Sequence, residues 1–90
     1  MTKQVYFVAA LTSPEAVEAK LRELVPDDAM RYKLAHDKWF VSFDGITNDL
    51  AEKIGIRSDP YVGTGLVFPV SSYSGRAPTP VWDWLKLRMA

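Results

Sequence analysis

Residues 5–15, VYFVAALTSPE, contain the two signals from which the fold can be worked out. Residues 5–10 form a continuous apolar run that is too short for a helix, which predicts a central β-strand buried on both faces. Thr12 and Glu15 have the spacing of a helix capping box, and Pro14 suits the first turn of a helix, where a backbone N–H has no intrahelical partner. We therefore expect a strand that leads directly into a helix.

Similar patterns recur along the rest of the chain. The apolar stripe of the first helix continues to Val25, and residues 26–28 end it. Residues 30–34 alternate like a half-exposed strand, and residues 39–43 are aromatic and β-branched like a buried one. A second helix is expected from Thr47 to a left-handed Gly55, and residues 66–70 form a last strand.

This order, β-α-β-β-α-β, predicts a ferredoxin-like α+β fold with a four-stranded antiparallel sheet. The apolar first and third strands should lie inside, and Pro69 should place the fourth strand at an edge, because proline cannot donate to a ladder. The chain should be one domain of residues 1–90, with a core over residues 4–70. Residues 71–90 then add a Ser/Gly/Pro-rich loop and a C-terminal helix over residues 81–89.

Composition excludes several classes of function. The 90 residues include 11 basic and 11 acidic side chains, so the zero net charge argues against a protein that mainly grips nucleic-acid phosphate. The chain has no cysteine and one histidine, and we expect neither a metal site nor another cofactor. No apolar run approaches the roughly 18–20 residues of a membrane span, which predicts a soluble cytoplasmic domain.

In this fold both helices of the core cover one face of the sheet, so the other face needs a cover of its own. We expect the larger alternating set of side chains on the strands to face the helices. This leaves an open apolar face with Tyr6, Val8, Ala10 and Phe40. Three covers are compatible with the sequence: a second copy of the chain, single-stranded RNA, or the C-terminal helix with its anchors Trp82 and Trp84.

Cationic and hydroxyl side chains near that face are candidates for anion or phosphate contacts. They are Arg31 and Lys33 on the second strand, and Ser72, Ser74 and Arg76 in the loop. No base is evident for a serine nucleophile in this loop, since the one histidine, His36, is distant in sequence. His36 and Asp37 are adjacent in a predicted turn, where neighbouring side chains point apart, so no catalytic residue is assigned.

The first half of the chain resembles an RNA recognition motif. Residues 5–11 (VYFVAAL) look like its first signature and residues 38–43 (KWFVSF) like its second. This resemblance implies base stacking on Tyr6 and Phe40.

The whole chain is more similar to small bacterial SinR-like proteins, relatives of the small ferredoxin-like protein of CRISPR adaptation complexes. The similarity lies in residues 6–8 (YFV), residues 39–41 (WFV), residues 68–70 (FPV), and above all residues 72–78 (SYSGRAP) leading to residues 82–85 (WDWL). It implies a homodimer. The CRISPR relatives hold a metal with an aspartate at the end of strand one, where this chain has residues 9–11 (AAL) and no carboxylate.

These observations favour a non-catalytic protein–protein interaction module that forms a homodimer. The first alternative is an RNA or single-stranded nucleic-acid binding protein that uses Tyr6 and Phe40. A metal-dependent nuclease is the second alternative.

Overall fold

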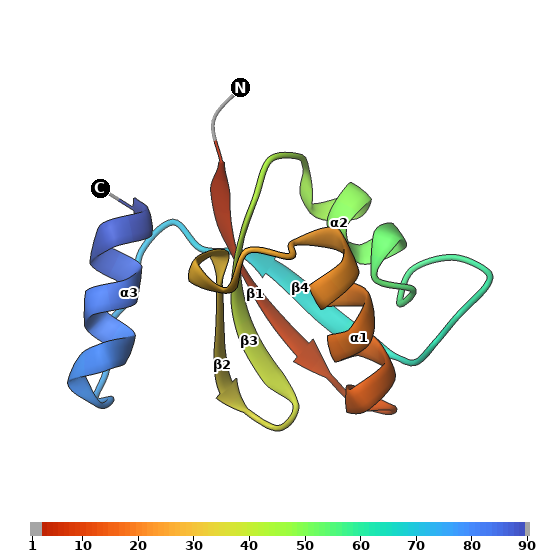
Figure 1. Ribbon diagram of the computed structural model, residues 1–90, viewed down its shortest axis with the longest axis horizontal. Helices are drawn as coiled ribbons and strands as arrows, with labels where there is room; N and C mark the ends of the chain where they lie inside the picture. The colour runs from red at the N-terminus through yellow and green to blue at the C-terminus, as the bar shows by residue number, and fades with distance from the viewer. Residues whose placement is uncertain (1–2, 90) are drawn as a thin grey trace.

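The computed structural model describes residues 3–89, and its elements follow the expected order (Figure 1). A 3-10 helix, η1, precedes the second strand. The elements are β1 (Gln4–Ala10), α1 (Pro14–Leu24), η1 (Asp28–Met30), β2 (Arg31–Ala35), β3 (Lys38–Phe43), α2 (Thr47–Lys53), β4 (Gly65–Pro69) and α3 (Thr79–Met89).

The four strands form one antiparallel sheet in the order β2-β3-β1-β4. The predicted α+β class and strand order are confirmed, with the apolar strands β1 and β3 inside. Pro69 lies on the edge strand β4, where it is opposite Tyr6 of β1. Figure 1 shows α1 and α2 together on one face of the sheet and α3 on the other.

The main core lies between the sheet and the two helices α1 and α2. Its largest fully buried side chains include Trp39 of β3, Leu21 of α1 and Leu50 of α2. Burial of side chains of this size contributes about 1.5–3 kcal/mol each, relative to leaving them exposed. Gly55 ends α2 with a φ of 78°, as the sequence predicts, and its amide donates to the Glu52 carbonyl.

The start of α1 differs from the prediction. Thr12 does not cap the helix; Ser13 is the N-cap residue, and it makes no side-chain capping bond. Thr12 Oγ1 instead accepts a hydrogen bond from the Thr64 amide at 2.9 Å and lies 3.0 Å from Thr64 Oγ1. The hydroxyl that the capping box would use therefore joins the end of β1 to the start of β4.

A second, smaller apolar cluster holds α3 against the sheet. Val81 and Leu85 of α3 are buried with Val5 of β1, and the half-buried side chains around them include Tyr32, Phe40 and Trp84. The helix predicted over residues 81–89 begins two residues earlier, at Thr79. None of the helices in residues 3–89 is long and apolar enough to cross a bilayer.

Candidate functional site

The residues of β1 that face the open side of the sheet differ from those predicted from the sequence. In the antiparallel register Val8 lies opposite Trp39, and Phe7 opposite Phe40. Opposed residues project to the same face, so Tyr6 and Val8 join the core under α1 and α2. They are only 3% and 0% exposed, respectively. The assignment of Tyr6, Val8 and Ala10 to the exposed face was therefore wrong, and Phe7 takes their place.

Four aromatic side chains form a row across the open face, one from each strand. Tyr32 is opposite Phe40, Phe40 is opposite Phe7, and Phe7 is opposite Phe68. The Phe7 and Phe40 ring centroids are 5.6 Å apart. This aromatic row runs across the strands and includes only one of the stacking candidates, Phe40.

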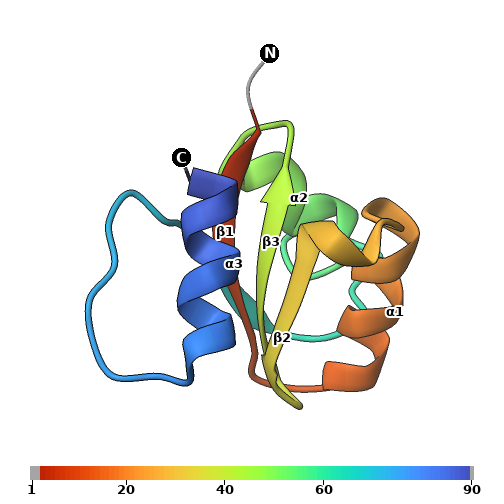
Figure 2. The same cartoon turned by 60° about the vertical axis from the view of Figure 1, so that its left-hand side comes forward.

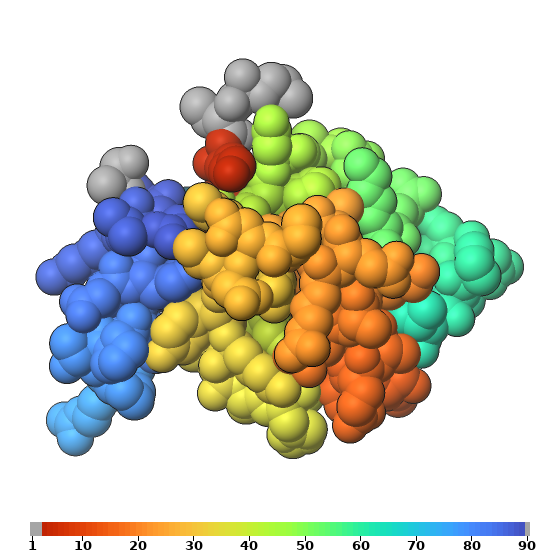
Figure 3. All heavy atoms as spheres, viewed as in Figure 1, coloured from red at the N-terminus to blue at the C-terminus, as the bar shows by residue number. Residues whose placement is uncertain are grey.

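Helix α3 covers one half of the aromatic row. The Trp84 ring stacks on Phe40, with centroids 6.2 Å apart and planes at 18°, and also contacts Tyr32 at 6.2 Å. Figure 2 shows α3 lying along the sheet on the side away from α1, and in Figure 3 its atoms border those of η1 and β2. Of the three covers considered, the C-terminal helix thus occupies the β2–β3 side of the face.

A cluster of hydrogen bonds to one carbonyl fixes the position of α3. The Ala29 oxygen in η1 accepts from Trp84 Nε1 at 2.9 Å, and from Arg88 Nε and Nη2 at 2.9 and 2.6 Å. The Arg88 guanidinium also lies 5.5 Å from the centre of the Trp84 ring, within range of a cation–π contact. Trp84 is therefore an anchor within the chain.

Trp82 anchors a different segment. Its ring stacks on Tyr73 at 5.7 Å and 19°, and its Nε1 donates to the Ala77 carbonyl at 3.1 Å. These contacts attach the loop after β4 to α3. The anion candidates Ser72, Ser74 and Arg76 lie in this loop with exposed side chains, away from Arg31 and Lys33.

The other half of the aromatic row remains uncovered. Leu66 and Phe68 of β4 are 49% and 51% exposed, and Phe7 beside them is half-buried. We call these three residues the β1–β4 patch. None of the three is among the site residues predicted from the sequence. Matching the register of β1 to β3 would have indicated Phe7, and alternation along β4 would then have indicated Leu66 and Phe68.

The cations of β2 lie on the opposite face from Phe40. Arg31 Nε donates to the Val25 carbonyl at 2.6 Å and its Nη2 pairs with Asp28. Lys33 Nζ is 3.1 Å from the Glu18 carboxylate of α1. Burial opposes ionisation of Glu18, but its hydrogen bond to Lys33 and the charges of Lys33 and Arg22 outweigh it and lower the Glu18 pKa. Both cations therefore serve contacts on the helix side.

The adjacent pair His36 and Asp37 lies at the surface in the β2–β3 turn. His36 Nε2 is 3.9 Å from the Asp37 carboxylate, which also pairs with Lys38 at 3.0 Å. The hydrogen bond from Lys38 lowers the pKa of Asp37. Within residues 3–89, no three His, Asp or Glu side chains are grouped closely enough to hold a metal ion.

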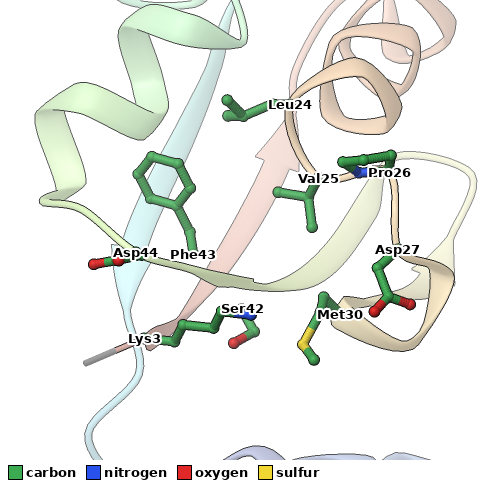
Figure 4. Close-up of a pocket in the computed structure, with 9 residues that line it drawn as sticks. All are labelled: Lys3, Leu24, Val25, Pro26, Asp27, Met30, Ser42, Phe43 and Asp44. Atoms are coloured by element: carbon green, nitrogen blue, oxygen red, sulfur yellow. The ribbon is translucent and has the colours of Figure 1, made fainter. Parts of the chain in front are cut away.

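An apolar cavity of about 290 Å³ lies between the C-terminal end of α1 and the end of β3 (Figure 4). Leu24, Met30 and Phe43 supply much of its apolar lining. Its two carboxylates, Asp27 and Asp44, lie on opposite sides of it, and Asp27 accepts a hydrogen bond from the Ala29 amide. They do not form the close pair that acid–base chemistry needs.

Comparison of the chain with protein-family models and with curated proteins finds no match. The geometry of the β1–β4 patch is therefore the basis for assigning a function.

Proposed function

We propose that this protein is a non-catalytic interaction module that pairs with a second copy of itself through the β1–β4 patch. The observation that carries the proposal is the continuous aromatic row, of which α3 covers only the half formed by Tyr32 and Phe40. Apolar side chains that lie side by side in water are stabilised when a complementary apolar surface removes them from solvent.

The geometry of β4 favours face-to-face packing over extension of the sheet. The Val70 amide donates to the Val5 carbonyl at 2.9 Å, and amides alternate in direction along a strand. Residue 69 would therefore donate outward, and as a proline it has no N–H to donate. The missing donor weakens the pairing of another strand with the outer edge of β4. The side chains of Leu66 and Phe68, in contrast, remain accessible on the open face.

Charge and size are compatible with association of identical chains. A formal net charge of zero places no long-range repulsion between two copies. A standard interface buries about 800 Å² per partner, roughly a seventh of the 5604 Å² surface of this chain. The three patch residues are too few to supply that area, so we expect a weak dimer whose contacts extend beyond them.

A nucleic-acid binding function has less support. Base stacking would use Phe7 and Phe68, but neutralisation of phosphate would need cations near them. Arg31 and Lys33 are on the other face and already have acidic partners. Nucleic-acid binding is therefore an outcome that the test must distinguish.

The proposal agrees with the homodimer that the SinR-like resemblance implies. We propose that the chain is related to the SinR-like proteins, on the basis of the residues quoted above, and that it is located in the cytoplasm. The α+β order of the elements is compatible with it.

Sedimentation equilibrium from micromolar to millimolar concentration tests the proposal. We expect the average mass of the wild type to rise above 10.1 kDa toward twice that value, and Phe68→Glu to remain at 10.1 kDa. Ile46→Glu is the matched control, because Ile46 is 63% exposed at the start of α2 on the other side of the sheet.

Two results would reject self-association. One is a wild type that stays monomeric throughout the range. The other is a wild type that binds a random single-stranded oligonucleotide pool, with Phe68→Glu abolishing that binding and leaving the mass unchanged.

A further inference from the structure

A second cavity, of about 370 Å³, lies where the start of β1, the end of β4 and the C-terminal end of α3 meet. Figures 1 and 2 place the beginning of β1 and the end of α3 at the same end of the molecule. Lys3, Ser71 and Arg88 line the cavity with polar groups, and none of the lining residues within 3–89 is acidic. Val5 and Met89 add an apolar wall.

The Arg88 side chain is held in place by contacts with neutral groups, which leave its positive charge uncompensated. Its Nε and Nη2 both donate to the neutral Ala29 carbonyl, and its guanidinium lies against Trp84. Among residues 3–89, the ion pairs of the protein involve other cations, and neither Arg88 nor Lys3 has an acidic partner. The cavity is therefore lined by two cationic residues, and hydrogen bonds hold one of them, Arg88, in place.

The remaining donors come from separate segments of the chain. Gln4 Nε2 donates to the Val70 carbonyl at 2.9 Å and the Val5 carbonyl at 3.3 Å, so this amide joins the two strand ends and is already used. Within residues 3–89, Lys3 Nζ, Ser71 Oγ and Arg88 Nη1 make no hydrogen bond to another side chain or carbonyl, so we take them as the donors for a ligand. Lys3 also borders the apolar cavity of Figure 4, and its long side chain can reach either one.

We propose that this cavity binds the phosphate group of a small phosphomonoester. A phosphate group carries about −1.5 to −2 charges and has three terminal acceptor oxygens. Two cations and a hydroxyl that come from three segments can each bind one of these oxygens, whereas a planar carboxylate offers only two oxygens and a single charge. The cavity is larger than a phosphate, and the Val5 and Met89 wall accepts a short organic group. This site is separate from the β1–β4 patch.

Titration with inorganic phosphate and with phenyl phosphate, followed by ¹H–¹⁵N spectra at constant ionic strength, tests the proposal. We expect saturable shifts at the Lys3, Ser71 and Met89 amides and at the Arg88 Nε–H, with tighter binding of phenyl phosphate. Lys3→Gln should weaken binding at least about fivefold, or 1 kcal/mol. Lys86→Gln, an exposed cation of α3 outside the cavity, should leave binding unchanged.

Shifts that do not saturate, or equal losses in Lys3→Gln and Lys86→Gln, would overturn the site. Neither variant removes a contact that docks α3, so both should fold; Ser71→Ala offers a second, uncharged test with the same expected direction. Phe68→Glu should bind phenyl phosphate like the wild type, which keeps failure of this site distinct from failure of self-association.

Discussion

Replacing Trp84 tests how firmly α3 is docked on the open face. Trp84→Ala removes the aromatic contacts with Phe40 and Tyr32 and the hydrogen bond to Ala29. Each aromatic pair contributes about 0.5–1.5 kcal/mol and the hydrogen bond about 0.5–1.5 kcal/mol. We therefore expect Trp84→Ala to lower the free energy of unfolding by about 2–4 kcal/mol.

Trp84→Phe separates the ring from its N–H. The Ala29 carbonyl keeps both donors from Arg88, so loss of the indole N–H leaves no unsatisfied acceptor. We expect this variant to lose no more than about 1 kcal/mol.

Urea unfolding, monitored by far-UV circular dichroism, measures both variants against the wild type. Leu87→Ala is the matched control, because Leu87 lies in the same helix with 71% of its surface exposed and should lose less than about 0.5 kcal/mol. A Trp84→Ala variant as stable as Leu87→Ala would refute the docking of α3 described above.

Three further substitutions test contacts on the face of the sheet that α1 and α2 cover. Gly55→Ala should destabilise the fold by about 1–2 kcal/mol or more in thermal unfolding, because Gly55 has a left-handed φ and its new Cβ would lie 2.8 Å from Val62 Cγ2. Tyr6→Phe should cost about 1–3 kcal/mol in urea unfolding, since the Tyr6 hydroxyl donates to the Gly45 carbonyl; an unchanged midpoint would contradict this. The pKa of Glu18 is lower in the folded state than in the unfolded state. Its ion pair therefore stabilises the fold fully at pH values above the unfolded-state pKa, and this stabilisation is lost as the pH falls through the folded-state pKa. Unfolding measured from pH 7 to pH 2 should therefore show Glu18→Gln less stable than the wild type near neutrality and equal to it in acid.

The order and placement of the strands could be predicted from local chemistry. The continuous apolar run of β1 predicts a central strand, and the missing N–H of Pro69 predicts an edge; burial of β1 on both faces is only partly found, because Phe7 is half-buried. Gly55 likewise indicates the end of α2, because few residues other than glycine adopt its φ without a penalty. Each of these signals depends on a residue and its near neighbours.

The composition of the open face could not be read from each strand separately. Tyr6 and Phe7 are adjacent and both aromatic, so bulk alone does not decide which of them faces the helices. The register decides it, because Phe7 is opposite Phe40 and therefore shares its face. Choosing the face for each strand by side-chain size led to the wrong assignment.

Long-range hydrogen bonds account for the other differences. Thr12 bonds to Thr64 across 52 positions, and Trp84 bonds to Ala29 across 55. Helix α3 is apolar around most of its circumference, which indicates that it packs against another surface. The pattern does not identify that surface. That surface is the apolar cluster around Val5, and hydrogen bonds to the Ala29 carbonyl in η1, an element not expected from the sequence, add to the docking.

The most direct measurement of the central claim is an isotope-filtered NOE experiment on a mixture of labelled and unlabelled chains at millimolar concentration. Self-association through the patch predicts intermolecular contacts from the rings of Phe7 and Phe68 and from the Leu66 methyl groups. Intermolecular contacts that involve other surfaces and spare these three residues, or a spectrum with none at all, would contradict it.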